Sequence, residues 1–153
     1  MPDVNDLAPD FALPCTGGGT IRLSELRGQT VVLFFYPRDD TPGCTKESIG
    51  FSDAHHAFSD AGTAVFGISK DSLSSHDKFA AKHGLGVPLL SDENGQTCED
   101  YGVWKEKKMY GKTFMGIERT TVLIDPDGQV SHIWRKVKVP GHVDEVLATL
   151  KQG

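Results

Sequence analysis

The chain has 153 residues, a formal net charge of −5 and a charged fraction of 24%. This length fits one domain with a substantial core, so we expect a single domain over residues 1–153. The negative charge and the lack of a basic stripe argue against nucleic-acid binding. The chain starts with polar and acidic residues, and its longest apolar run, 31–36, is too short to cross a membrane. We therefore expect a cytoplasmic protein without a membrane or nucleic-acid partner.

The cysteines support the same expectation. There are three, Cys15, Cys44 and Cys98, at wide spacing and with no CxxC pair. An odd number at such spacing does not indicate a disulfide framework, and it suits a reducing cytosol. The lack of CxxC argues against a dithiol oxidoreductase and against a zinc ribbon.

The N-terminal half is predicted to alternate strands with helices. The run Val31-Val32-Leu33-Phe34-Phe35-Tyr36 is apolar throughout, which is typical of a central strand covered on both faces. The predicted elements are a hairpin of 11–13 and 20–23, a helical turn at 24–28, the strand at 31–36, a helix over 44–61, a strand at 64–69 and a helix from 74 to 83.

The C-terminal half predicts a different arrangement. A short strand at 87–90 and a short helix at 95–101 come first, and 106–108 is expected to be a solvated loop. Strands at 120–124 and 129–136 flank an Asp-Pro-Asp-Gly turn, which indicates an antiparallel hairpin. A last helix starts near residue 142. Strand–helix alternation implies parallel crossovers, so we expect an α/β fold: a mixed central sheet with helices on both faces.

Cys44 is the residue with the clearest chemical signal. It follows the buried strand and lies at the start of a predicted helix, among Pro, Gly, Asp and Thr residues that are typical of a turn. A lone cysteine is most often a small buried hydrophobe. At a helix N-terminus, however, unpaired amides and the helix dipole favour a reactive thiolate. Open α/β sheets also place their sites at the carboxyl ends of strands.

A thiolate at this position needs a cation, because Asp39 and Asp40 lie close by in the sequence. Arg38 and Lys46 are near in the chain. Arg119, which precedes a buried strand, is the third candidate. An arginine keeps its charge and can hold both an anionic sulfur and a polar oxygen.

The pattern Pro37-x-x-x-Thr41-x-x-Cys44 resembles the active-site signature of peroxiredoxins, which are thiol peroxidases of thioredoxin-like fold. The flanking residues are similar to the bacterioferritin comigratory protein branch, also called peroxiredoxin Q. The resemblance covers nearly the whole chain. Its other segments are Gly67–Ser72, Pro88–Asp92, Gly116–Thr121 and Trp134–His142.

The resemblance implies a role for each residue of the signature. Cys44 would attack a peroxide oxygen and become a sulfenic acid. Thr41 would hydrogen-bond the peroxide, Pro37 would shield the pocket, and Arg119 would stabilise the thiolate and polarise the substrate. The backbone amide of Gly43 would help to bind the substrate. The implied partners are hydrogen peroxide, alkyl hydroperoxides and a thioredoxin or small-thiol reductant, with no cofactor or metal. The run Glu106-Lys107-Lys108, expected to be a solvated loop, could also lie near the docking face of the reductant, because it directly precedes Met109-Tyr110-Gly111. A monomer is expected, and a weak dimer is also compatible.

The chain departs from this family at the resolving cysteine. Ile49 stands five residues after Cys44, and Ala80-Ala81 stands in the next long helix, where many members carry that cysteine. Two alternatives remain: an external thiol reduces the sulfenic acid, or Cys98 or Cys15 acts as the resolving cysteine after a rearrangement. We expect Cys98 to pack one face of a short helix and Cys15 to be exposed in a glycine-rich turn.

Two other function classes compete with an enzyme. A peroxide sensor or chaperone-like redox protein would use the same cysteine with little turnover, and the missing resolving cysteines favour it. A zinc-binding module is more remote. The adjacent His55 and His56 suggest metal binding, but neighbouring helical residues point about 100° apart and cannot share one ion.

Overall fold

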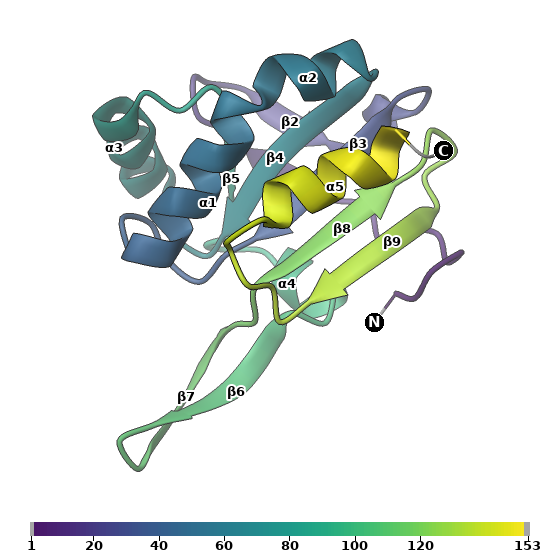
Figure 1. Cartoon of the computed structure of the whole chain (residues 1–153). Coiled ribbons are helices and arrows are strands. Elements are labelled where there is room, and N and C mark those ends of the chain that lie inside the picture. The colour runs from purple at the N-terminus through teal and green to yellow at the C-terminus, as the bar shows by residue number, and fades with distance from the viewer. Residues whose placement is uncertain (1, 152–153) are drawn as a thin grey trace.

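A five-stranded mixed sheet forms the centre of this computed structural model, which describes residues 2–151 (Figure 1). Strands β3, β4 and β5 are parallel, β8 is antiparallel to β3, and β9 is antiparallel to β8. The mixed sheet predicted from the strand–helix alternation is therefore confirmed. Across the sheet the strands are β5 (Leu89–Ser91), β4 (Thr63–Ser69), β3 (Thr30–Phe35), β8 (Thr120–Ile124) and β9 (Val130–Arg135).

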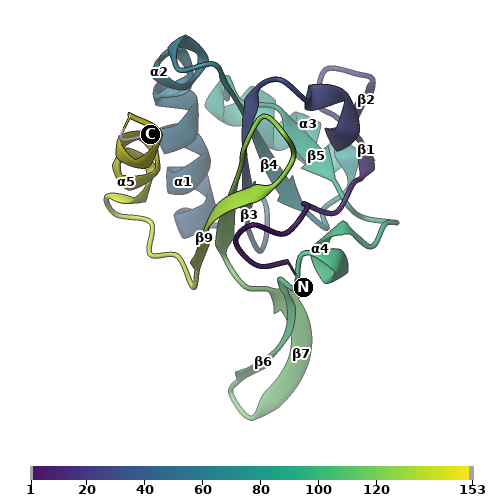
Figure 2. The same ribbon diagram turned by 90° about the vertical axis from the view of Figure 1, so that its right-hand side faces the viewer.

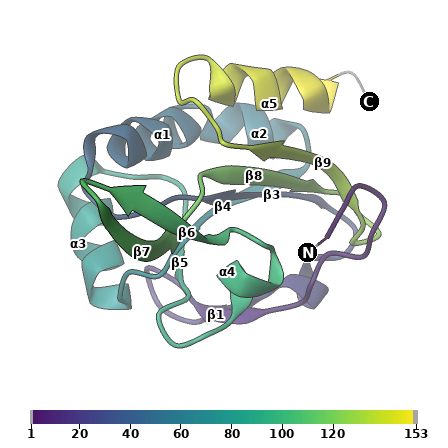
Figure 3. The same cartoon turned by 90° about the horizontal axis from the view of Figure 1, so that it is seen from below.

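Helices cover both faces of the sheet, as predicted, but unequally (Figure 3). The longer helices share one core cluster with one face, and the other face is covered by short N-terminal elements and one short helix. The first group is α1 (Pro42–Asp53), α2 (His55–Asp60), α3 (Leu73–His83) and α5 (His142–Lys151). The second is the hairpin β1 (Ala12–Pro14) and β2 (Thr20–Arg22), the 3-10 turn η1 (Leu23–Leu26) and α4 (Thr97–Asp100). Within residues 2–151, no helix combines the length and apolarity needed to span a membrane.

The alternation of side chains along β3 divides the core into two clusters. Val32 and Phe34 pack with α1 on one face, whereas Leu33 and Phe35 point to the other. All of these side chains have exposures of 0%. The sheet is therefore a continuous wall between the two clusters, and side chains on opposite faces cannot meet without disrupting it.

A two-stranded ribbon, the arm, projects from the body of the molecule (Figures 1 and 2). It consists of β6 (Trp104–Met109) and β7 (Lys112–Ile117), joined by Tyr110 and Gly111. The expectation of a solvated loop at 106–108 is therefore wrong. Both turn residues have positive φ, 54° and 75°, as a tight hairpin turn requires. The first of these positions usually carries asparagine, aspartate or glycine, so with a tyrosine there the sequence alone does not predict the turn.

The predicted helix over 44–61 is also corrected. It starts two residues earlier, at Pro42, where a proline is favoured because the first helical amide needs no partner. It is then interrupted at Ala54, whose ψ of 4° leaves the helical range, and α2 restarts at His55. The other predicted elements of the sheet and helices are present, with ends that differ from the prediction by at most two residues.

We predict that Gly67→Ala destabilises the protein by roughly 1–3 kcal/mol, because overpacking a core strains its neighbours. A Cβ on Gly67 would lie 2.7 Å from Phe34 Cζ and 2.8 Å from Leu89 Cδ2. Urea unfolding measures the effect. Gly86→Ala is the matched control, since its Cβ would meet nothing closer than 3.8 Å. Equal midpoints for the two variants would contradict this account of the sheet packing.

Candidate active site around Cys44

Cys44 is the third residue of α1, directly beyond the carboxyl end of β3. The sequence predicted this position at a helix start, and the structure confirms it. The side chain is only 1% exposed and belongs to the apolar cluster under α1. The turn residues around it therefore do not keep it out of the core. Cys44 combines a buried environment with the amide-rich end of a helix.

Thr41 is the N-cap residue of α1, but its side chain does not cap the helix. Its hydroxyl instead donates to the carbonyl of Arg38 at 2.9 Å. Thr41 is extended, with ψ of 154°, so the helix begins sharply after it. The first-turn amides of Gly43 and Cys44 consequently receive no side-chain cap, and they have no intrahelical acceptor.

Arg119 is the cation that reaches the sulfur. Its Nη2 donates to Cys44 Sγ at 3.3 Å. The pairing of Phe35 with Thr120 places the start of β8 beside the end of β3, which brings Arg119 to α1 across 75 residues of sequence. The other two candidates, Arg38 and Lys46, are exposed. Of the three predicted cations, only Arg119 makes this contact.

Glu47 is a site residue that the sequence analysis missed. Arg119 Nη1 donates to its Oε1 at 2.7 Å, so one guanidinium contacts both the sulfur and this carboxylate. The Glu47 side chain is fully buried, and its Oε2 has no hydrogen-bond partner among residues 2–151. Burial raises the pKa of Glu47 to about 7, although Arg119 opposes this shift. The sequence contained one signal that could have identified Glu47: it lies three residues after Cys44 and therefore on the same helix face.

Gly43 lies against the guanidinium. A Cβ at this position would be 3.1 Å from Arg119 Nη2, closer than ordinary side-chain contacts. The absence of a side chain therefore allows Arg119 to approach the helix start. Pro37, the remaining residue predicted for the site, is half-buried at the beginning of the loop.

The loop that carries the site is fastened to α3. Asp39 is buried and accepts hydrogen bonds from Tyr36 Oη at 2.6 Å and Ser75 Oγ at 2.8 Å, and it contacts His76 Nδ1 at 2.7 Å. Its own amide donates to Asp71 at 2.8 Å. Next to it, Asp40 has a φ of 60° and forms an ion pair with Lys82 and a hydrogen bond with His83, both of α3.

Asp39, Asp71 and His76 present ligand atoms within 4.8 Å of one another, the spacing of a metal site. Within the described residues, however, these atoms are already engaged in hydrogen bonds with one another and with neighbouring residues. His76 Nε2 faces the Leu90 carbonyl at 2.9 Å, so both ring nitrogens face acceptors. Asp71 Oδ2 accepts from Ser69 and from the amide of Asp39. The cluster is best explained as a hydrogen-bond network that holds the loop.

The two other cysteines lie across the sheet from Cys44. Cys15 and Cys98 belong to the cluster on the opposite face. Cys98 is 0% exposed within α4, as predicted, and burial raises the pKa of its thiol far above the usual value. The expectation of an exposed Cys15 is wrong: it is 6% exposed, because residue 15 pairs with Leu90 at the edge of the sheet.

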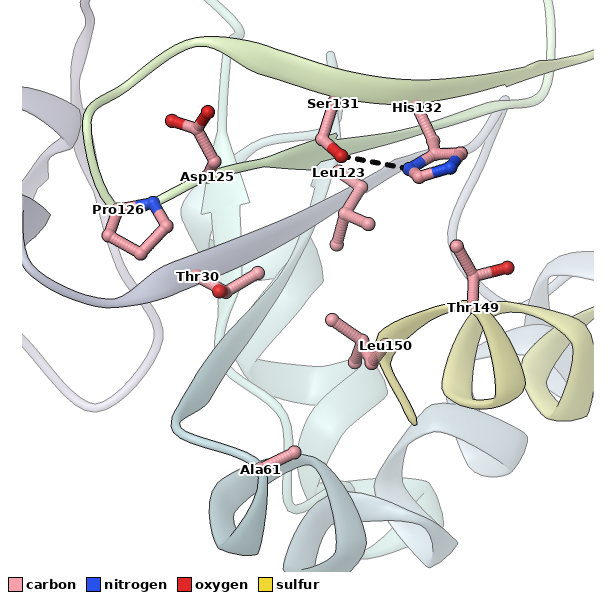
Figure 4. Close-up of a pocket in the computed structure, with 9 residues that line it drawn as sticks. All are labelled: Thr30, Ala61, Leu123, Asp125, Pro126, Ser131, His132, Thr149 and Leu150. Carbon is pink, nitrogen blue, oxygen red and sulfur yellow. Dashed lines mark hydrogen bonds between the residues drawn. The ribbon is translucent and has the colours of Figure 1, made fainter. Parts of the chain in front are cut away.

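A cavity of about 560 Å³ lies at the other end of the sheet (Figure 4). It is bordered by Thr30, the first residue of β3, whereas Cys44 follows the last. Its polar groups are engaged locally: Ser131 and His132 share a hydrogen bond of 2.9 Å, and Asp125 Oδ1 accepts two amides of its own turn. This cavity contains none of the reactive groups described above.

Comparison with known proteins identifies the family. A model of the AhpC/TSA family matches residues 4–133. The chain belongs to this family. Among curated relatives, the putative peroxiredoxin bcp of Coxiella burnetii is 51% identical over 97% of this chain and 98% of its own length. Peroxiredoxin Bcp of Bacillus subtilis is 46% identical over 97% of this chain and 95% of its own. The resemblance to the bacterioferritin comigratory protein branch of the peroxiredoxins, stated from the sequence, is confirmed.

Solved structures agree with this assignment. The bacterioferritin comigratory protein of Xanthomonas campestris, studied for its alkyl peroxide reduction activity, superposes with a TM-score of 0.91 at 45% identity, covering 98% of each chain. The peroxidoxin BcpB of Mycobacterium tuberculosis superposes with a TM-score of 0.87 at 38% identity, covering 99% of this chain and 98% of its own. The predicted thioredoxin-like fold is therefore confirmed for this peroxiredoxin.

We predict that Gly43→Ala slows the reaction of Cys44 with hydrogen peroxide about tenfold, equivalent to ~1.4 kcal/mol. The new methyl group would displace Arg119 from the sulfur. Rapid-mixing kinetics with one equivalent of peroxide measures the effect. Gly50→Ala is the matched control, because its Cβ would be equally close, 3.1 Å, to Val143 Cγ2 and not to the site. The prediction fails if both variants slow the reaction equally.

A second prediction concerns pH. The pKa of Glu47 rises on folding from 4.5 to about 7, so folding is favoured by this group below pH 4.5, and that contribution is lost as the pH rises through 7. Glu47→Gln removes this pH-dependent loss of stability, because a glutamine side chain does not titrate. Relative to wild type, the variant should gain stability on the order of 1–3 kcal/mol between pH 5 and pH 8.

Urea unfolding at several pH values between 5 and 8 tests this pH dependence. Glu93→Gln serves as the control, since Glu93 is exposed and its replacement should leave the pH profile unchanged. A constant stability difference between Glu47→Gln and wild type across this range would show that Glu47 does not titrate there.

Proposed function

We propose that this peroxiredoxin is a thiol-dependent peroxidase that reduces hydrogen peroxide and alkyl hydroperoxides through Cys44. The observation that carries the proposal is the contact of 3.3 Å between Arg119 Nη2 and the buried Cys44 sulfur at a helix N-terminus. The Cys44 thiolate attacks the terminal peroxide oxygen, an S–O bond forms as the O–O bond breaks, and the leaving hydroxide or alkoxide takes a proton from solvent, which gives a sulfenic acid and water or an alcohol.

Each remaining residue has a place in this step. The uncapped amides of Gly43 and Cys44 and the Arg119 guanidinium can donate to the peroxide oxygens as negative charge develops on them. Rotation of the Thr41 side chain away from the Arg38 carbonyl would turn its hydroxyl toward the substrate. Pro37, half-buried at the start of the loop, would shield the loop side of the active site. Glu47 holds the guanidinium through its other nitrogen and thereby orients it.

We further propose that an external thiol, thioredoxin or a small thiol, reduces the sulfenic acid. The sheet separates Cys44 from Cys15 and Cys98, so an internal disulfide would require disruption of the core. The external thiol forms a mixed disulfide with Cys44 and releases water, and a second thiol then releases Cys44. Three cysteines without disulfides suit a reducing compartment such as the cytoplasm.

A peroxide sensor with little turnover is the alternative. The observation that favours it is the burial of Cys44 at the end of a loop that Asp39 and Asp40 fasten to α3, which restricts access of a reductant to the oxidised sulfur. Turnover separates the two functions. A peroxidase consumes many equivalents of peroxide in the presence of a thiol, whereas a sensor is oxidised once.

Peroxide consumption by cysteine variants, with dithiothreitol as the reductant, tests the proposal. Cys44→Ser should abolish activity, because a serine hydroxyl is a far weaker nucleophile of nearly the same size. Cys15→Ser and Cys98→Ser should retain it. Residual activity of Cys44→Ser above about a tenth of wild type would place the nucleophile elsewhere.

The same proteins allow the resolving step to be examined. After one equivalent of hydrogen peroxide, the intact mass should show one added oxygen or an adduct with an added thiol. A loss of two hydrogens that disappears in Cys98→Ser or Cys15→Ser would identify an internal resolving cysteine and refute the external route.

A further inference from the structure

The arm carries most of the exposed large hydrophobic side chains among residues 2–151. Residues 2–151 contain six exposed large hydrophobic residues, and four of them are in the arm. They are Met109 (57% exposed), Tyr110 (96%), Phe114 (44%) and Met115 (49%). A cluster of this kind on one projecting element is typical of an interaction site rather than of scattered surface residues.

The two faces of the arm differ in charge. Residues directly opposite in an antiparallel pair share a face, so the register assigns each side chain to one of them. The first face, called the basic face, carries three lysines, two apolar side chains and no acid: Lys105, Lys107, Met109, Lys112 and Phe114. The second face mixes charges and carries Glu106, Lys108, Thr113 and Met115.

The basic face is the one that adjoins the active site. The Lys107 stem lies over Gly116, within 3.1 Å of where a Cβ would be, and its Nζ donates to the Ile117 carbonyl. This holds the ammonium at the base of the arm, two residues before Arg119. Burial and the charge of Arg119 lower the pKa of Lys107, and the Cys44 thiolate opposes them, so all three groups lie within electrostatic range.

The dimensions allow one partner to cover both the arm and the site. Six residue pairs at ~3.3 Å per residue make the arm about 17 Å long. A typical protein interface of about 800 Å² per partner is roughly 30 Å across. A small globular protein bound to the basic face would therefore extend to Arg119 and Cys44.

We propose that the basic face of the arm is the docking surface for an acidic dithiol protein that reduces oxidised Cys44. This rests on the proposed peroxidase function. Charge complementarity indicates an acidic partner, because this face bears three lysines on a chain whose net charge is −5. A second copy of the chain fits less well, because its three cysteines are all buried and it could not deliver a thiol.

The reaction at this surface balances without a further reagent. A thiolate of the partner attacks the sulfur of the Cys44 sulfenic acid, an S–S bond forms, the S–O bond breaks, and the hydroxide leaves as water after taking a proton. The partner's second thiolate then attacks its own sulfur in the mixed disulfide, and Cys44 leaves as a thiolate. The partner supplies both electrons and ends as an internal disulfide.

The test uses protein oxidised with one equivalent of peroxide and then mixed with thioredoxin, a small dithiol protein, or with dithiothreitol. Regenerated Cys44 is alkylated and counted by intact mass. Phe114→Ser and Lys112→Glu should each slow reduction by thioredoxin about tenfold and leave reduction by dithiothreitol unchanged. The matched controls are on the opposite face: Met115→Ser, of similar exposure, and Lys108→Glu should leave both rates within about twofold of wild type.

Four results would overturn the docking surface alone: equal slowing by the variants of both faces, equal slowing with dithiothreitol, a changed rate of peroxide reaction, or a loss of dimers in Phe114→Ser on size-exclusion chromatography. Wild-type protein that dithiothreitol reduces but thioredoxin does not would also overturn it and leave the peroxidase intact. Oxidised wild type that neither thiol reduces would refute the proposed function and the docking surface together.

Discussion

The structure depends on one guanidinium that serves two buried groups. Arg119 donates one nitrogen to the Cys44 sulfur and another to the Glu47 carboxylate, at 3.3 and 2.7 Å. Removing charges from water is costly unless they are paired. Here two acidic groups compete for a single fixed positive charge, and the raised pKa of Glu47 shows that the pairing does not fully offset its burial. The carboxylate therefore aligns the guanidinium and at the same time takes part of its charge from the sulfur.

This arrangement depends on the register between β3 and β8. Arg119 can reach α1 only because β8 runs antiparallel to β3 and starts beside its end, where Phe35 faces Thr120. Strand β7 of the arm ends two residues before Arg119 and β8 begins directly after it, so a single chain segment connects the projecting ribbon, the cation and the central sheet. The position of the sulfur, in turn, depends on the sharp helix start after Thr41, where Pro42 begins the helix and Gly43 leaves room for the guanidinium.

The sequence allowed prediction of the elements that are fixed by local patterns. The apolar run of β3, the turn residues before Cys44 and the Asp-Pro-Asp-Gly hairpin each carry their own signal, and Arg119 could be proposed because it precedes a buried strand. What could not be predicted depends on tertiary contacts. Glu47 resembles a surface residue of a polar helix until the fold buries it. The arm has mostly polar strands, and its Tyr-Gly turn lacks the usual asparagine or aspartate.

The hydrogen bonds between the active-site loop and α3 affect how fast this loop can open. Asp39 and Asp40 together bind Ser75, His76, Lys82 and His83 of that helix. Each such contact contributes ~1 kcal/mol or less, but they must open together before the loop can move outward. A partner protein reaches the buried sulfur only when the loop opens, so the opening rate of these contacts sets an upper limit on how fast the oxidised enzyme is reduced. The pace of the catalytic cycle would thus depend on the contacts with α3 as well as on the reactivity of the sulfur.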